Sequence, residues 1–183
     1  GLPLAVKDEV AIEGERTTHG SLLRRDAIDT ATSPFMERLL DARAIVHART
    51  TCPEFSCTTV THSRLWGITR NPWNPDHSPG GSSGGAAAAV ASGMVPAANA
   101  SDGGGSIRIP AAMCGLVGLK PSRGRISQGP KEEWGFSCQH ALTHTMRDTA
   151  AILDACAIPF PGDGVVAPDH GRPYADRVGW DPG

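Results

Sequence analysis

Residues 77–115 read HSPGGSSGGAAAAVASGMVPAANASDGGGSIRIPAAMCG and place two clusters of glycine and serine on either side of an alanine-rich run. Such clusters are typical of flexible linkers when polar, disorder-prone sequence flanks them. Here the first cluster leads directly into alanines, the best helix formers, and the second leads into SIRIPAAMCG. The pattern therefore favours two ordered loops of a folded domain over a linker.

Two familiar glycine motifs do not explain these loops. Neither G-x-x-x-x-G-K-[ST] nor G-x-G-x-x-G is present, so a phosphate site would rest on glycine content alone. The pattern G-x-S-x-G does occur, over residues 80–84 and 81–85, and is typical of the nucleophile elbow of α/β-hydrolases. That elbow needs a strand just before it, and the preceding NPWNPDHSP cannot form a central strand. The elbow is therefore excluded.

Strand and helix patterns alternate along the chain, which predicts the α/β fold class. Ser33 followed by Pro34 is a helix start, with a capping serine and proline at the first helical position. A further short helix is expected from Ser106, limited by Pro110. The other expected elements are strands over residues 4–6, 44–48, 95–102 and 115–119, and helices over residues 34–44, 85–94 and 147–156.

Composition narrows the classes of partner. The net charge is −2 and no basic stripe is present, which argues against a nucleic acid partner. The longest apolar run, the alanine segment, is too short to span a bilayer, which argues against a membrane. The chain passes directly from Gly1 into a predicted strand and ends in loop-like sequence, so we expect residues 1–183 to be a single partial domain, truncated at both ends.

The five cysteines show no CxxC spacing and leave one unpaired in any disulfide scheme. This favours a reducing compartment, with the cysteines as small buried hydrophobic residues. No Cys/His pair has zinc-ligand spacing, and no motif implies a cofactor, so neither a metal nor a cofactor is expected.

The DGGGS cluster, residues 102–106, has the features of a nucleophile site. Consecutive glycine N–H groups before a helix can stabilise an oxyanion, and a serine beside them can attack if a base removes its proton. No histidine is a good candidate for that base, because His62, His77, His140 and His144 are expected at the surface or in loops.

Lys7 is the candidate base. It lies in the apolar stretch PLAVKD, and burial favours the neutral form of a lysine. A second serine between lysine and nucleophile could relay the proton. The alternative left open by the residues alone is a salt bridge from Lys7 to Asp8 or to another carboxylate.

Together these residues closely resemble the amidase signature family. The similarity covers GLPLAVKD, TTCPEFSC, TRNPWNPDHSPGGSSGGAAAAVASG and SDGGGSIRIPAAMCGLVGLKPSRGRIS, and it is most specific from Ser78 to Arg125. Members of this family are serine hydrolases that cleave carboxamides with a Ser–cis-Ser–Lys triad. The resemblance therefore implies the family fold, an α/β/α sandwich around a mixed β-sheet, and a small-molecule amide as substrate.

The resemblance also implies a role for each matching residue. Ser106 matches the nucleophile, Ser82 matches the bridging serine after a cis Gly81–Ser82 bond, and Lys7 matches the base rather than only half of a salt bridge. Gly103, Gly104, Gly105 and the Ser106 N–H match the oxyanion hole. Asp102 and Arg108 are expected to form an ion pair that holds the loop, and Ser83 is expected to support the site by hydrogen bonding.

Within the family, Ile109 stands where the glutamine-hydrolysing component of the tRNA-dependent amidotransferase typically has glutamine, which disfavours that branch. NPWNP, AANASDGGGSIRIP and GLKPSRGR look more like stand-alone bacterial amidases, including 6-aminohexanoate cyclic-dimer hydrolases. We therefore expect hydrolysis of a linear or cyclic non-peptide amide in the cytoplasm. A homodimer stays open as the assembly, and a non-catalytic fragment or binding module stays an alternative.

Overall fold

The computed structural model describes residues 1–129, 136–169 and 171–179, and it is built on a five-stranded sheet in the order β2-β1-β5-β7-β6. The sheet strands are β1 (Pro3–Lys7), β2 (Ile45–Thr50), β5 (Ala97–Asp102), β6 (Val117–Gly118) and β7 (Cys138–Thr143). The strands β2, β1 and β5 run parallel, whereas β7 is antiparallel to both β5 and β6. The sheet is therefore mixed, as expected.

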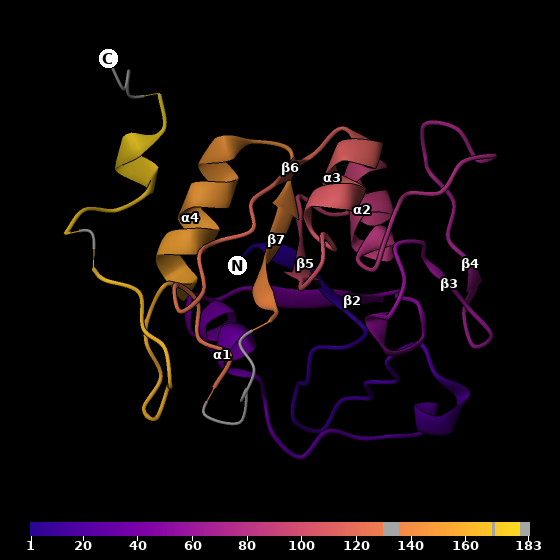
Figure 1. The fold of residues 1–183 in the computed structure, drawn as a ribbon, viewed down its shortest axis with the longest axis horizontal. Helices are drawn as coiled ribbons and strands as arrows, with labels where there is room; N and C mark the ends of the chain where they lie inside the picture. Colours follow the sequence, from indigo (N-terminus) through magenta and orange to yellow (C-terminus); the bar gives the residue numbers. More distant parts are fainter. Residues whose placement is uncertain (130–135, 170, 180–183) are drawn as a thin grey trace.

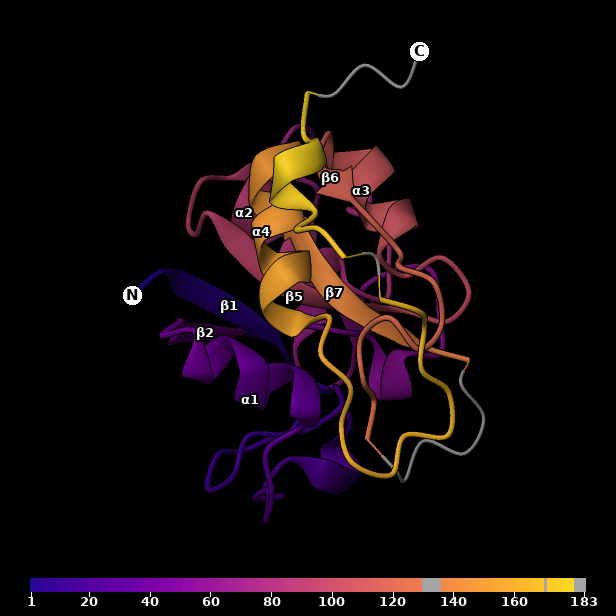
Figure 2. The same cartoon turned by 90° about the vertical axis from the view of Figure 1, so that its left-hand side faces the viewer.

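Helices cover both faces of this sheet. They are α1 (Pro34–Asp41), α2 (Gly84–Ala91), α3 (Arg108–Cys114) and α4 (Met146–Cys156). In Figure 1 the sheet lies between α1 and α4 on one side and α2 and α3 on the other. Figure 2 looks onto the first of these layers, with α4 in front of β5 and β7. The predicted α/β/α layering is confirmed.

Smaller elements lie in the connections. A two-stranded antiparallel sheet consists of β3 (His62–Ser63) and β4 (Gly67–Ile68), and the 3-10 helices are η1 (Leu22–Arg24), η2 (Glu54–Ser56) and η3 (Ala175–Arg177). Within the described part of the chain, no helix is long and apolar enough to cross a membrane.

The two hydrophobic cores follow from side-chain alternation along β1. Leu4 and Val6 pack with residues of α1 and α4, whereas Ala5 packs with residues of α2 and α3 on the opposite face. The α2 side is built largely of alanine, which allows the helix to lie close to the sheet. Gly85 shows how close this contact is, because a Cβ atom there would lie 2.5 Å from the backbone nitrogen of Thr51.

Parallel pairing positions the functional loops. Because β2, β1 and β5 are parallel, their carboxyl ends meet at one edge of the sheet. The segments that follow these ends begin at Thr51, Asp8 and Gly103, so three parts of the sequence meet at that edge. Ligands of open α/β sheets bind at such an edge.

The structure corrects four sequence expectations. His140 was expected at the surface or in a loop, but it lies fully buried on β7, a strand that was not predicted and that pairs on both sides. The strand over residues 44–48 was expected to be buried, whereas β2 forms a sheet edge and leaves Ile45 56% exposed. Ser33 begins α1, but its side chain makes no capping hydrogen bond. The cysteines are all free thiols, and Cys57, beside the short η2 helix, is exposed rather than buried.

Candidate active site

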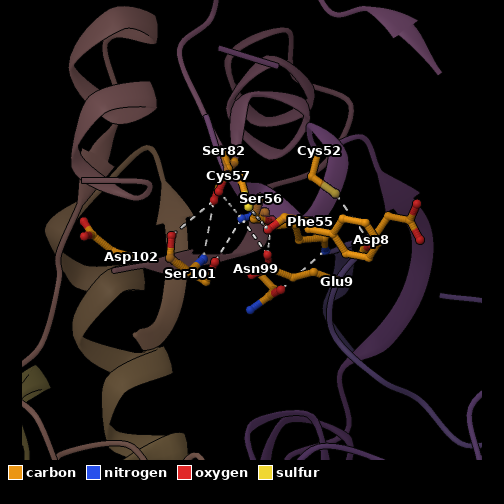
Figure 3. Close-up of polar contacts among 12 residues, drawn as sticks. Asp8, Glu9, Cys52, Phe55, Ser56, Cys57, Ser82, Asn99, Ser101 and Asp102 are labelled. Atoms are coloured by element: carbon orange, nitrogen blue, oxygen red, sulfur yellow. Dashed lines mark hydrogen bonds and ion pairs between the residues drawn. The ribbon is translucent and has the colours of Figure 1, made fainter. Parts of the chain in front are cut away.

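Lys7 is the last residue of β1, and its side chain is fully buried. It follows Ala5 by two residues and therefore points to the same face of the sheet, toward α2. Its Nζ lies 2.6 Å from Ser82 Oγ, 2.9 Å from Ser101 Oγ and 3.1 Å from a carboxylate oxygen of Glu9. Figure 3 shows that Ser82, Ser101 and Glu9 come from separate segments and lie near one another.

Ser82 lies in the loop that leads into α2, and the Gly81–Ser82 peptide bond is cis. A Cβ atom at Gly81 would lie 2.7 Å from Val60 N, so only glycine fits there. The next residue, Ser83, shares two 3.4 Å hydrogen bonds with the backbone of Ser101, accepting from its N–H and donating to its carbonyl. These contacts fix the serine pair against the end of β5.

Asp102, the last residue of β5, organises the glycine loop that follows. One of its oxygens accepts the Gly105 N–H at 2.7 Å, and the other accepts the Ile107 N–H at 3.2 Å. Arg108 Nε donates to the same carboxylate at 2.8 Å, so the expected ion pair is present in the structure. Burial raises the pKa of Asp102, but these donors outweigh it and hold the pKa below its usual value. In Figure 3 the Asp102 side chain points away from Ser82 and Ser101.

Ser106 comes at the end of this loop, just before α3, and faces a cavity of about 340 Å³. The cavity is polar because serines, glutamines and exposed backbone form most of its wall. Its lining residues are Glu9, His19, Ser56, Ser82, Ser101, Gly103, Gly104, Ser106, Gln128, Ser137 and Gln139. Ser82 and Ser106, the predicted bridging serine and the predicted nucleophile, therefore line one space.

The three glycines predicted to form the oxyanion hole differ in their surroundings. Gly103 and Gly104 line the cavity, whereas the Gly105 N–H donates to Asp102. Gly105 has a φ of 122°, a conformation that strongly favours glycine. In this structure Gly105 thus serves the turn that presents Ser106.

Glu9 and Ser101 are members of the site that the sequence reasoning missed. Burial raises the pKa of Glu9, but the electrostatic effect of the nearby Lys7 and hydrogen bonds from Ser101, Ser56 and Lys7 outweigh it, so the pKa is lowered. Lys7 therefore does form a salt bridge, as the alternative interpretation predicted, and its partner is Glu9 rather than Asp8. A carboxylate two residues after the lysine was the available signal.

Among the described residues, Cys52, His19 and Asp8 are further titratable groups near Lys7 and Glu9. Burial raises the pKa of the Cys52 thiol to about 12, so this thiol is protonated and a poor nucleophile. Burial lowers the pKa of His19, and the positive charge of Arg24 lowers it further. These two effects outweigh the opposing charges of Glu9 and Asp8. The carboxylate of Asp8 accepts hydrogen bonds from the Thr18 backbone N–H and from the Trp66 indole instead of from Lys7.

Known proteins share both the sequence and the fold of this chain. The amidase family profile matches residues 1–178. The chain belongs to the amidase signature family. It is 44% identical over 154 residues to 6-aminohexanoate-cyclic-dimer hydrolase from Paenarthrobacter ureafaciens, covering 81% of this chain and 31% of that protein.

This amidase chain also resembles a second branch and a solved structure. It is 42% identical over 170 residues to a glutamyl-tRNA(Gln) amidotransferase component from Chloroflexus aurantiacus (strain ATCC 29366 / DSM 635 / J-10-fl), covering 92% of this chain and 35% of that protein. The structure of 6-aminohexanoate cyclic dimer hydrolase complexed with substrate superimposes with a TM-score of 0.94 at 38% identity, covering 100% of this chain and 39% of that one. The chain thus spans between about a third and two fifths of the length of these relatives.

Proposed function

We propose that the complete protein carrying this sequence hydrolyses a carboxamide through an acyl-enzyme on Ser106. The observation that carries this proposal is the 2.6 Å contact between Lys7 Nζ and Ser82 Oγ, made beside a cavity that Ser106 also lines. A buried amine, a bridging hydroxyl and a serine at a glycine loop together provide a base, a relay and a nucleophile.

In the first half of the reaction, Ser106 Oγ attacks the amide carbonyl carbon. Its proton passes to Ser82, and the proton of Ser82 passes to the neutral amine of Lys7. The resulting tetrahedral oxyanion is stabilised by backbone N–H groups of the loop, for which Gly103, Gly104 and Ser106 are the donors we assign. The C–N bond then breaks as the proton returns through Ser82 to the leaving nitrogen, and the amine departs.

In the second half, water attacks the acyl ester and gives its proton to the same relay. The ester C–O bond breaks, Ser106 recovers its proton, and the carboxylic acid leaves. Asp102 acts indirectly, because its carboxylate accepts backbone N–H groups of the turn from which Ser106 projects, and Arg108 pairs with that carboxylate. Ser83 supports Ser82 through the backbone of Ser101.

The substrate we propose is a small linear or cyclic non-peptide amide, in line with the similarity to 6-aminohexanoate cyclic dimer hydrolase. The cytoplasm remains the compartment we expect. The second candidate, glutamine hydrolysis within a tRNA-dependent amidotransferase, is supported by the 42% identity to the amidotransferase component. Ile109 counts against it, since that branch typically has glutamine at this position.

The experiment uses a fluorophosphonate probe on the complete protein, with the adduct located by mass spectrometry. We expect one adduct on Ser106, absent in Ser106→Ala and slowed by about 100-fold or more in Ser82→Ala and Lys7→Ala. Ser92→Ala is the matched control, because Ser92 is an exposed hydroxyl at the end of α2. No adduct, or an adduct on Ser82 or Ser83, would contradict the assignment.

A further inference from the structure

We propose that Glu9 is a positioning residue of the proton relay: its carboxylate orients the Lys7 amine and stabilises the ammonium that forms when the relay takes up a proton. This inference rests on the proposed function and extends it to a fourth side chain. It starts from the 3.1 Å ion pair between Glu9 and Lys7.

The three partners of Lys7 Nζ match the chemistry of a relay. An ammonium has three N–H donors, and the structure supplies three acceptors in Ser82, Ser101 and Glu9. A neutral amine has two N–H donors and one lone pair. With Ser101 and Glu9 accepting the two donors, the lone pair faces Ser82, so the proton can move along that contact without any rearrangement.

The local backbone holds Glu9 in this position. Its N–H donates to the carbonyl of Lys7 at 2.7 Å, and so does the Val10 N–H at 3.0 Å, which closes a turn directly after β1. The Ser56 hydroxyl donates to the Glu9 carboxylate from the loop after β2. The Glu9 side chain is 13% exposed and lines the same cavity as Ser106.

Among the described residues, Glu9 is the anionic group paired with the lysine. The other titratable groups around the pair are Cys52 and His19, whose pKa values are shifted toward their neutral forms at neutral pH, and Asp8, which bonds to Thr18 and Trp66. An adjacent carboxylate favours the charged form of an amine and strengthens it as a base. This arrangement resembles the orienting carboxylate of a Ser-His-Asp triad, with lysine in place of histidine.

The charge of Glu9 should change both the pH range and the plateau rate of the reaction. An ionised carboxylate 3.1 Å from an amine favours the charged form of that amine, so we expect the acid limb of the reaction to lie at higher pH with Glu9 than without it. Once deprotonated, the lysine is the stronger base, so the plateau rate is higher. Removing the charge should therefore move the acid limb to lower pH and lower the plateau at the same time, which a merely structural role would not do.

The test measures the second-order rate of fluorophosphonate labelling of Ser106 against pH in the complete protein. For Glu9→Gln we expect the midpoint of the acid limb to fall by about one pH unit and the plateau to drop by about tenfold or more. Glu9→Asp keeps the negative charge but places it farther from the Lys7 amine, because the side chain is one methylene shorter. The midpoint of its acid limb should lie between those of the unmodified protein and Glu9→Gln. Glu15→Gln is the control, since Glu15 lies 3.8 Å from Arg49 and outside the cavity lining.

An unshifted acid limb in a folded Glu9→Gln variant overturns the proposal. Glu9 would then be assigned to the recognition of a cationic substrate, an interaction that labelling by a neutral probe does not measure. If Glu9→Gln does not fold, Glu9→Asp decides, and an unshifted midpoint there overturns it equally. Absence of Ser106 labelling in the unmodified protein would instead refute the proposed function, so the two failures are distinguishable.

Discussion

Lys7 Nζ and Ser82 Oγ lie 2.6 Å apart, although 75 positions separate the two residues in the sequence. The contact requires two separate features. Parallel pairing of β1 with β5 brings the ends of both strands to the same edge of the sheet, and the close approach of α2 brings the serine loop down onto that edge. Changes that disturb either feature should therefore affect the site as well as the fold.

Asp102→Asn should test how strongly the buried Asp102 carboxylate holds the glycine loop in place. The buried carboxylate accepts the Gly105 and Ile107 N–H groups as well as Arg108, and an amide cannot replace all of these bonds. We expect a loss of about 2 kcal/mol of unfolding free energy and strongly reduced labelling of Ser106, measured by denaturant titration and by the fluorophosphonate assay.

Arg108→Ala is the matched control for this prediction. The Arg108 side chain is 55% exposed, and its loss leaves in place the backbone N–H groups of Gly105, Ile107 and residue 108 that donate to Asp102. A smaller loss of stability and of labelling is expected. Equal effects of the two variants would show that the ion pair, and not the backbone contacts, holds the loop.

His140 should make stability fall in mild acid. Burial lowers its pKa to about 4, opposed by weaker backbone contacts from Leu119 and Thr149. Between about pH 6.5 and 4 the unfolded chain therefore binds the proton more readily than the folded one, and stability decreases as pH falls through this window. The full contribution is about 3 kcal/mol by the time both states are protonated.

The measurement is the melting temperature of the complete protein between pH 7 and pH 4, compared with that of His140→Gln. The variant lacks the titrating ring, so its melting temperature should depend less on pH across the window. Parallel curves for the two proteins would contradict a buried neutral histidine.

Gly85→Ala should disrupt the packing of α2 on the sheet edge. The new methyl group would lie 2.5 Å from Thr51 N, a backbone atom that cannot move aside cheaply. We expect a loss of about 3 kcal/mol or more of unfolding free energy, or failure to fold, measured by thermal melting. Gly164→Ala is the control, because no atom lies within 4 Å of the added group; similar melting of both variants would argue against the close contact.

Much of this protein is determined by local sequence. The alanine run forms α2, Pro34 lies at the start of α1, and the glycines around Ser82 and Ser106 form loops rather than linkers, because each depends on the preferences of neighbouring residues. The motifs also allowed Lys7, Ser82 and Ser106 to be named as one set, through a family resemblance.

Tertiary structure alone decided the rest. β7 was not predicted from the sequence because Gln139 and His140 are polar and do not match the pattern of a buried strand. The strand becomes buried only by pairing with β5 and β6. The ion pair of Lys7 with Glu9, and the hydroxyl of Ser101 beside it, likewise depend on where a turn and a parallel strand end in space. Local preference determines which segments form helices and loops, whereas the partners of a buried charge are determined by contacts between segments far apart in the chain.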